Sequence, residues 1–558
     1  MDREAALAAL TAPGERYELE EVELYGRTSR VFRHAPLTLR DLYDQTRSDL
    51  PFIVYGEERL SFEEAWGEAC RIATLLVEQY GIQKGDRVAI SMRNYPEWMT
   101  AFAAVTSVGA VAVALNALWQ PGELAYGLED SGAGVLLADE ERLERLGRCG
   151  STFPDLAVLA VRVSEFHGVD ARPLDAALSG LEAPPMPSVD VHPNDDATIF
   201  YTSGSTGHPK GVVSCHRNVI TALLSWELDV HAAALMRGVE FVVPNEQQTT
   251  LLAVPLFHVT GSHAVYLASY RAQRRIVSMY KWNVELAAEL IERERISSVF
   301  APPAMTGDLV ATAERTQRDL SSLVTVGGGG APRAPSQVRS IGRAFGKALP
   351  NTGWGMTETN AIGAGIAGRD YLDHPESSGR SSAVLDLRVV DQEGKSLPLG
   401  ERGELQVRGT SVFRGYWNRP DADAETFVDG WMRTGDVAYL DGEGFLYLVD
   451  RIKDLVIRGG ENIGCGAVEA ALLEHPDVVE ASVYGVPDVR LGEEVGATVF
   501  VQGSLSAEAL RAFLEPRLAA FEIPRHLHFA DAPLPRTASG KIFKRQLREE
   551  ALSGLPVG

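Results

Sequence analysis

Short apolar segments alternate with amphipathic segments over roughly the first 370 residues of the chain. The apolar segments end in glycine, proline or polar residues and lie at residues 86–92, 134–139, 198–203, 250–257, 297–303 and 323–330. This rhythm predicts mostly parallel sheets whose strands are joined by helical crossovers. Because ligands of such sheets collect where strands end and loops begin, the loops after these segments are candidate positions for a site.

Residues 61–81 illustrate the amphipathic segments. The pattern predicts a helix that begins with a capping box from Ser61 to Glu64 and ends at Gly81. Cys70 shares one helical face with large apolar side chains, so we expect the Cys70 thiol in the core.

A stretch without charged residues, 98–122, is long enough to span a membrane. Gly109 divides it, and it is rich in alanine, threonine and serine. We therefore interpret it as a helix that follows Pro96 and then a buried strand at 110–115. We expect both in a soluble core, and no transmembrane segment.

The pattern changes beyond about residue 380, where turn signals become frequent. Residues 385–409 are typical of antiparallel strands joined by glycine-containing turns, and residues 439–463 continue this texture. The last part of the chain has a helix–strand–strand–helix pattern of its own. We place a domain boundary near residues 451–453, which gives domains at residues 1–450 and 451–558.

Composition and charge narrow the classes of function. The chain has 558 residues, a net charge of -23 and four scattered cysteines without a C-x-x-C pair. We expect reduced thiols in a cytoplasmic protein, because the N-terminus has no secretory pattern. The negative charge disfavours binding to nucleic acid or to an anionic membrane. An anionic ligand must therefore meet a local cluster of donors.

The segment YTSGSTGHPKGV, residues 201–212, holds such a cluster. Its glycines let backbone N–H groups face an anion, its hydroxyls add donors and its lysine adds charge. The candidate residues are Ser203, Gly204, Ser205, Thr206, Gly207, Lys210 and Gly211. It is not the familiar phosphate loop, because Lys210 follows Pro209 instead of opening a helix. A solvated glycine–serine turn is the alternative, but a phosphate site is favoured because the segment directly follows a strand.

This segment resembles the signature loop of the acyl-adenylate-forming superfamily, which includes acyl-CoA synthetases, aryl-CoA ligases, adenylation domains and beetle luciferases. Further matches follow in family order: PLFHVTG (255–261), GGGGAP (327–332), GWGMTET (353–359), GELQVRG (403–409), GYW (415–417), GWMRTGD (430–436), DRIKDLVIRGGENI (450–463) and PRTASGKIFKRQLR (535–548). The matches cover most of the chain from about residue 195 onward, and the earlier part fits less diagnostically.

The resemblance implies a fold and a reaction. The fold is α/β, with a large N-terminal domain of mostly parallel sheets with helices, a β-barrel-like subdomain and a small mobile α/β C-terminal domain. In the reaction, a carboxylate attacks the α-phosphorus of ATP to give acyl-AMP and pyrophosphate. A thiol, usually that of coenzyme A, then displaces AMP. Because the first step joins two anions, catalysis is chiefly charge neutralisation and positioning.

The resemblance also implies the phosphate and metal contacts. The loop 203–211 with Lys210 holds the β- and γ-phosphates of ATP, and Thr357 binds the α-phosphate. Thr202 and Glu358 stand near Mg²⁺, an ion that prefers hard oxygen ligands.

The nucleoside contacts come from three motifs. One wall of the adenine slot consists of Gly329, Gly330, Ala331 and Pro332. Trp354, followed by Gly355 and Met356, stands where the family usually has Tyr, and an indole stacks on adenine at least as well. Asp436 accepts hydrogen bonds from both ribose hydroxyls, and Arg451 assists at the ribose.

Lys541 is the main candidate for a catalytic side chain. Family members bring this lysine from the C-terminal domain to bridge the carboxylate and the α-phosphate. The domain then swings about a hinge, here Lys453, to admit coenzyme A. His258 stands at the mouth of the acyl pocket in relatives, and a purely structural histidine is the alternative.

The segment that faces coenzyme A departs from the family at two positions. Cys465 stands where the family usually has Pro, and Ala467 stands where it has Glu, whereas Glu469 is retained.

The motifs also indicate the substrate class. Residues 255–266 hold no acidic side chain for a substrate ammonium, so we expect an acid without an α-amine. The GGENI run favours coenzyme A over carrier-protein loading, and nothing points to light emission. We expect an acyl-CoA synthetase for medium- or long-chain fatty acids, with an apolar pocket lined by residues 297–308, 327–332 and 360–368.

Two alternatives stay open. One is an aryl-CoA ligase for cinnamate- or benzoate-like acids, and the other is a relative that binds nucleotide without catalysis. The sequence also leaves the oligomeric state open, a homodimer included.

Overall fold

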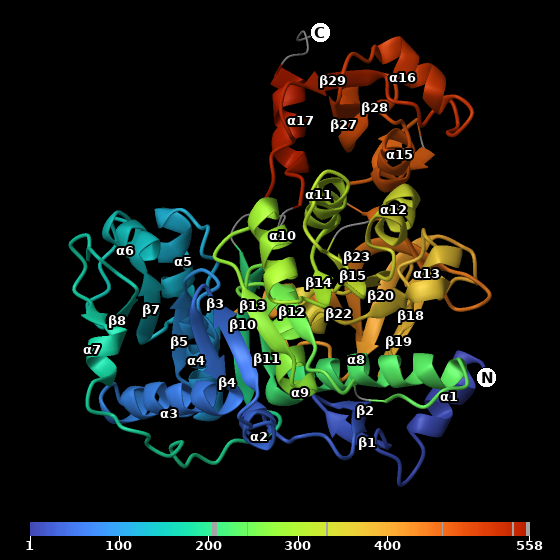
Figure 1. Ribbon diagram of the computed structural model, residues 1–558. Helices are drawn as coiled ribbons and strands as arrows, with labels where there is room; N and C mark the ends of the chain where they lie inside the picture. Colours follow the sequence, from blue (N-terminus) through green and yellow to red (C-terminus); the bar gives the residue numbers. More distant parts are fainter. Residues whose placement is uncertain are drawn as a thin grey trace.

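The computed structural model describes residues 1–202, 209–242, 244–330, 333–452, 454–459, 461–537 and 541–553. Two large sheets with helices and a curled antiparallel sheet form the N-terminal part, and a smaller α/β unit lies above them (Figure 1). The mixed α/β fold class expected from the sequence is confirmed.

One large sheet has eight strands in the order β21-β11-β10-β6-β5-β7-β8-β9. Its strands are β5 (Arg87–Ser91), β6 (Val111–Ala114), β7 (Val135–Asp139), β8 (Ala157–Val161), β9 (Arg172–Pro173), β10 (Asp196–Thr202), β11 (Lys210–Cys215) and β21 (Gly415–Tyr416). The strands from β10 to β9 are parallel, whereas β11 is antiparallel to both of its neighbours. The strands expected at 86–92 and 134–139 are central members, and burial on both faces explains their uninterrupted apolar runs.

The other large sheet has nine strands in the order β18-β17-β16-β15-β14-β12-β13-β3-β4. They are β3 (Pro51–Tyr55), β4 (Glu58–Ser61), β12 (Thr249–Leu252), β13 (Arg275–Ser278), β14 (Ser298–Phe300), β15 (Thr325–Gly329), β16 (Leu349–Trp354), β17 (Ala364–Ala367) and β18 (Arg380–Ser381). The strands from β16 to β3 are parallel. Their carboxyl ends therefore meet at one edge of the sheet.

Helices cover both sheets. The helices of the N-terminal part are α1 (Arg3–Leu10), α2 (Leu39–Gln45), α3 (Phe62–Glu78), α4 (Pro96–Ser107), α5 (Pro121–Ser131), α6 (Glu140–Gly147), α7 (Leu174–Leu178), α8 (His216–Met236), the π-helix η1 (Thr260–Leu267), α9 (Ala268–Ala272), α10 (Val284–Arg293), α11 (Pro303–Ala313), α12 (Pro335–Phe345), the 3-10 helix η2 (Thr357–Thr359), α13 (Gly368–Asp373) and α14 (Pro420–Thr426). Helix α3 has the expected capping box between Ser61 and Glu64, and Cys70 on its apolar face is buried in the core.

Helices α3 and α4 lie between the two large sheets. They contact each other, while α3 also contacts β3 and β4 and α4 contacts β5 and β6. Every residue of α4 except Glu97 is buried, and Trp98 stacks on Phe102 with ring centroids 5.1 Å apart. This position explains the uncharged stretch 98–122, because a helix enclosed on all sides is apolar all round. The expected helix after Pro96 and the buried strand within 110–115 are confirmed.

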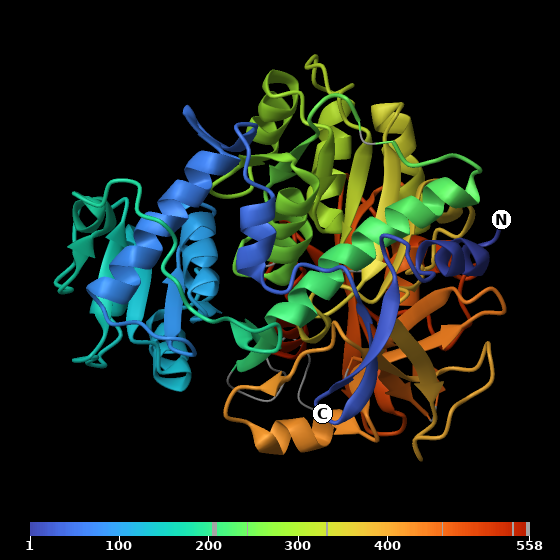
Figure 2. The ribbon, with the colours of Figure 1, turned by 90° about the horizontal axis from the view of Figure 1, so that it is seen from below.

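Helix α8 runs across the underside of the N-terminal part (Figure 2). Within the described part of the chain, it is the one helix long and apolar enough to cross a membrane, and 56% of its apolar window is buried. That evidence for a span is weak, because a core helix passes the same test.

The segment after α13 forms the antiparallel structure that the turn-rich pattern predicts. Its strands are β19 (Leu385–Val390), β20 (Gly403–Gly409), β22 (Phe427–Val428), β23 (Trp431–Leu440) and β24 (Leu446–Arg451). A separate hairpin near the N-terminus consists of β1 (Leu19–Leu24) and β2 (Arg27–Phe32).

The C-terminal unit has its own hydrophobic core. It comprises β25 (Val456–Arg458), β26 (Glu461–Ile463), α15 (Cys465–Leu472), β27 (Val478–Asp488), β28 (Gly492–Val501), α16 (Ala507–Leu514), β29 (His526–Ala530) and α17 (Lys544–Ser553). Asp450 at the end of β24 accepts a 2.5 Å hydrogen bond from the backbone N–H of Cys465. Proline, the usual family residue at this position, has no N–H to donate. The boundary at 451–453 stays a prediction, and Lys453 lies outside the described residues.

Candidate active site

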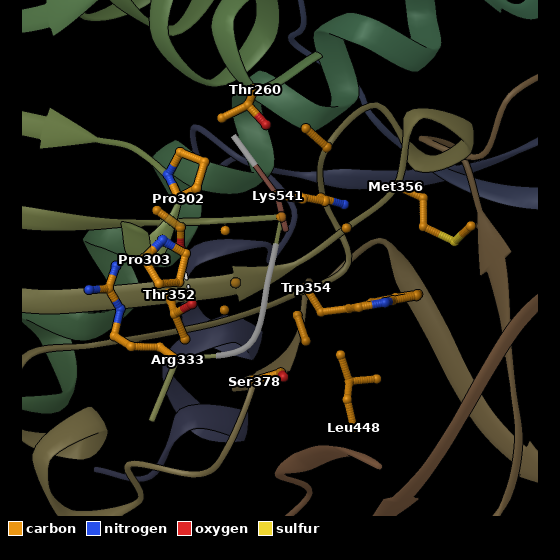
Figure 3. Close-up of a pocket in the computed structure, with 18 of the residues that line it drawn as sticks. Thr260, Pro302, Pro303, Arg333, Thr352, Trp354, Met356, Ser378, Leu448 and Lys541 are labelled. Carbon is orange, nitrogen blue, oxygen red and sulfur yellow. Dashed lines mark hydrogen bonds between the residues drawn. The ribbon is translucent and has the colours of Figure 1, made fainter. Parts of the chain in front are cut away.

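A cleft of about 4070 Å³ lies at the carboxyl edge of the nine-stranded sheet and extends to the C-terminal unit. The loops that follow β12, β14, β15 and β16 line it, and so does Lys541 from the C-terminal part (Figure 3). Motifs far apart in the sequence therefore meet in one place, at the strand ends where the topology predicts a site.

The buried carboxylate of Asp436 is the centre of a network on one side of the cleft. Its Oδ2 accepts a 2.8 Å hydrogen bond from Trp354 Nε1, and its Oδ1 lies 2.6 Å from Arg451 Nε. The pairing of β23 with β24 places Asp436 directly opposite Arg451. Burial raises the pKa of Asp436, while Arg451, Trp354 and Lys541 act in the opposite direction. The structure thus brings together the three residues expected around the nucleoside.

The indole at Trp354 does more than offer a stacking face. Its N–H reaches the carboxylate expected at the ribose, so the base wall and the ribose acceptor are directly bonded. Sequence reasoning assigned both residues to the nucleoside but did not foresee this bond, because 82 residues separate them.

Close packing explains two of the glycines beside this network. A Cβ on Gly328, whose φ is +148°, would lie 2.2 Å from the carbonyl oxygen of Ala301. A Cβ on Gly329 would lie 2.8 Å from the carbonyl oxygen of Gly353. Glycine is therefore required for β15 to approach its neighbours. Ala331 and Pro332, which follow Gly330 in the expected wall, lie outside the described residues.

Lys541 reaches the cleft beside this wall. An ideal Cβ on Gly330 would lie 3.7 Å from Lys541 Cε. The carbonyl oxygen of Lys541 accepts a 2.7 Å hydrogen bond from the N–H of Thr537, which closes the loop that carries the lysine. Lys541 is exposed to the solvent of the cleft, yet the surrounding protein and Arg451 lower the pKa of its ammonium, against the attraction of Asp436.

His258 also lines the cleft, in the loop after β12. Burial and the charge of Lys541 lower the pKa of His258 to about 4, so the imidazole is neutral at neutral pH. Its Nε2 has no hydrogen-bond partner among the described residues. The place of His258 at the mouth of an acyl pocket stays a prediction.

The phosphate side of the cleft begins with the β10–β11 hairpin. Thr202 ends β10 opposite Lys210, which begins β11. The loop is therefore followed by a strand and not by a helix, as its proline indicated. The five expected donors between these ends, Ser203, Gly204, Ser205, Thr206 and Gly207, lie outside the described residues.

Tyr416 contacts both Glu358 and Lys210 on the phosphate side of the cleft. Its hydroxyl donates a 2.9 Å hydrogen bond to Glu358 Oε1, and Lys210 Nζ lies 4.9 Å from the centre of its ring. Burial raises the pKa of Tyr416, which keeps the hydroxyl as a donor. Sequence reasoning noted the GYW motif but gave Tyr416 no role. The GYW motif was the sequence feature that could have pointed to Tyr416. The structure shows that its hydroxyl binds and orients the Glu358 carboxylate.

The segment after Trp354 completes the site. Gly355, Met356, Thr357 and Glu358 all line the cleft. Gly355 has no room for a side chain, because a Cβ there would lie 2.4 Å from the carbonyl oxygen of Ala361. Glu358 is buried at the start of η2, and the described residues leave its Oε2 without a hydrogen bond.

Trp354→Phe tests the bond between the base wall and Asp436. The phenyl ring keeps a stacking face but removes the N–H that the buried carboxylate accepts. Such a bond contributes about 1.5–3 kcal/mol, so we expect KM for ATP to rise about 10- to 100-fold in a pyrophosphate-release assay. Trp282→Phe is the matched control, because Trp282 donates to Asp308 near the surface. An unchanged KM in Trp354→Phe would contradict the positioning role.

Known proteins resemble the chain over most of its length. It is 35% identical over 498 residues to a feruloyl-CoA synthase of Amycolatopsis sp, covering 88% of this chain and 94% of the relative. It is 31% identical over 501 residues to the long-chain-fatty-acid–CoA ligase FadD13 of Mycobacterium tuberculosis, covering 89% and 94%.

A solved structure agrees in fold. It is the O-succinylbenzoate coenzyme A synthetase of Bacillus subtilis in complex with ATP and magnesium ion. The TM-score is 0.75 at 29% identity, covering 92% of this chain and 99% of the other. Residues 41–417 match the AMP-binding enzyme family and residues 467–541 match its C-terminal domain, so the chain belongs to the AMP-binding enzyme family.

Proposed function

We propose that this chain, an AMP-forming acid–thiol ligase that uses ATP and coenzyme A, acts on a long apolar carboxylic acid. The observation that carries the proposal is the position of Lys541. The lysine lines one cleft together with the Asp436 network and His258. A cytoplasmic location is part of the proposal.

In the first step the acid's carboxylate oxygen attacks the α-phosphorus of ATP, and the bond to pyrophosphate breaks. Negative charge gathers on the α-phosphate oxygens as the acyl–phosphate bond forms. Lys541, which lines the cleft next to Gly330, supplies a cation that stabilises this charge. Asp436 and Arg451 orient the ribose, and Lys210 neutralises the leaving phosphates.

Glu358 and Thr202 fit Mg²⁺. Glu358, a buried residue, offers its second carboxylate oxygen, and Thr202 offers a hydroxyl at the end of β10. Both are hard oxygen donors of the kind that Mg²⁺ prefers. The ion would neutralise phosphate charge when bound, while Tyr416 keeps the Glu358 carboxylate oriented.

In the second step the thiol of coenzyme A attacks the acyl carbonyl and AMP leaves. Lys541 and coenzyme A need the same face of the intermediate, so the C-terminal unit must turn between the two steps. We propose Lys453 as the residue that absorbs this rotation, between strand β24 and the C-terminal unit.

The lining of the cleft supports a fatty acid as the substrate. Small and apolar residues from the expected stretches, including Pro302, Pro303, Ala304 and Gly307, line it. An aryl-CoA ligase is the second candidate, favoured by the resemblance to feruloyl-CoA synthase. The retained Lys210, Glu358, Asp436 and Lys541 disfavour a relative that binds nucleotide without catalysis.

A coupled AMP-release screen over fatty and aromatic acids tests the substrate class. We expect turnover with straight-chain acids of about eight carbons or more, because the proposed apolar pocket would accommodate an extended chain. Rejection of these acids together with turnover of benzoates or cinnamates would favour the aryl-CoA ligase. A lack of ATP–pyrophosphate exchange with every acid would favour the non-catalytic alternative.

Lys541→Ala separates the two half-reactions. We expect acyl-AMP formation to fall by roughly 10²–10⁴, because the lost contact stabilises charge that develops in the transition state. Thioester formation from supplied acyl-AMP should be largely retained. Lys395→Ala, an exposed turn lysine, is the control. An equal loss in both half-reactions would refute the role assigned to Lys541.

Lys453→Pro tests the hinge. Proline fixes φ near -65° and removes an N–H, so the variant should be held in one domain arrangement. We expect ATP–pyrophosphate exchange to remain measurable while overall thioester synthesis collapses. Lys453→Ala, which leaves the backbone free, should retain both steps. Thioester synthesis at the wild-type rate in Lys453→Pro would place the hinge elsewhere.

A further inference from the structure

The cleft continues past the reaction centre as a channel between two helical segments. On α8 the lining residues recur at helical spacing on one face: Leu223, Trp226, Glu227 and Val230. On η1 and α9 they recur in the same way: Thr260, Ala264, Ala268 and Arg271. Helix α8 and η1 are in contact, and the residues on both faces line the same cavity.

The length of this channel suits an extended chain. From Thr260, which lines the pocket near Lys541 in Figure 3, the segment runs to Arg271. Twelve helical residues span about 15–20 Å, which corresponds to roughly 12–15 methylenes with C–C bonds of ~1.5 Å. Leu223, Ala264 and Ala268 make the middle of the channel apolar.

The far end of the channel is charged. Arg271 Nε lies 2.7 Å from Glu227 Oε2, and Arg16 pairs with the same carboxylate. Arg3 Nη2 lies 2.7 Å from Asp229 Oδ1. Each of these three arginines has an acidic partner on α8, although Arg271 and Arg16 share the carboxylate of Glu227.

Arg274 is different. It also lines the cavity, directly before β13, and no described residue forms a hydrogen bond or an ion pair with its guanidinium. Burial lowers the pKa of Arg274, and no neighbouring charge opposes that effect. A partly desolvated cation without a partner is costly, and an anion on the ligand would remove that cost.

We propose that Arg274 binds an anionic group at the far end of the acid, so that the preferred substrates carry a second carboxylate. This inference rests on the proposed function, because it assigns the far end of the same acyl channel. A guanidinium matches a carboxylate well, since its planar donors can bind both oxygens. The first carboxylate would meet Lys541 and the second would meet Arg274.

The test compares acids of equal length that differ at the far end. We would measure kcat/KM by AMP release with hexadecanedioic acid, its monomethyl ester and hexadecanoic acid, and with the same three forms at twelve and fourteen carbons. The ester keeps the length and removes the distal charge. We expect the diacid to exceed the ester about 10- to 100-fold at the best length, as a charge-assisted hydrogen bond implies.

Three variants assign that preference to Arg274. In Arg274→Leu the diacid-to-ester ratio should fall to about one, and in Arg274→Lys part of the ratio should remain, because the cation is retained. Arg295→Leu, at an exposed arginine paired with Asp319, should leave the ratio at the wild-type value. Thermal unfolding checks that each variant is folded, and the ratio is unaffected by the amount of active enzyme.

The outcomes separate the two proposals. A wild-type ratio of one or less at every length, or an unchanged ratio in Arg274→Leu, would refute the distal site while the ligase function stands. If Arg274→Leu does not fold, Arg274→Lys decides alone, and a ratio that equals or exceeds the wild-type ratio would refute the site. No turnover with any acid would refute the proposed function, and the distal site with it.

Discussion

The carboxylate of Asp436 is the contact on which the active-site geometry depends. One oxygen accepts a hydrogen bond from Trp354 on the nine-stranded sheet, and the other pairs with Arg451 at the end of β24. A buried carboxylate without such partners would favour its protonated form, as the raised pKa of Asp436 indicates. The two donors keep it available as an acceptor. They also connect the base wall to the strand that leads into the C-terminal unit.

The same strand end connects to the C-terminal unit through its backbone and through Asp450. One Asp450 oxygen accepts from the N–H of Arg451, and the other accepts from the N–H of Cys465. Cys465 is a departure from the family pattern, and its N–H is what makes the second bond. This bond ties α15 to β24 in the arrangement that places Lys541 in the cleft. A rotation of the C-terminal unit must either break this hydrogen bond or move Asp450 together with Cys465. The difference from the family at Cys465 therefore bears on the proposed hinge.

Positive side chains gather in the cleft although the chain as a whole is negatively charged. The protein carries a net charge of -23, yet Lys210, Arg451 and Lys541 gather where an anionic nucleotide is expected. The cleft therefore concentrates positive charge in a protein that repels anions elsewhere. The channel that leads away from Lys541 is apolar in the middle and cationic again at Arg274. A ligand that matches this pattern is anionic at both ends and apolar between them.

Local sequence patterns predicted several helices and strands, and sequence motifs supplied most of the candidate site residues. The capping box at Ser61, the helix after Pro96 and the buried strands at 86–92 and 134–139 follow from spacing and side-chain type, and the structure confirms them. These features depend on neighbours within a few residues, so the sequence carries them directly. The motifs indicated the family, and the family implied the nucleotide contacts.

The tertiary structure decided which of these side chains meet. The bond from Trp354 to Asp436 and the bond from Tyr416 to Glu358 join residues far apart in the chain. The absence of a partner for Arg274 among the described residues likewise depends on distant segments. Periodicity reports the face on which a residue lies, but not which distant segment packs against that face. Only the tertiary packing determines whether a charged side chain has an oppositely charged neighbour in the protein or is left to bind one on the ligand.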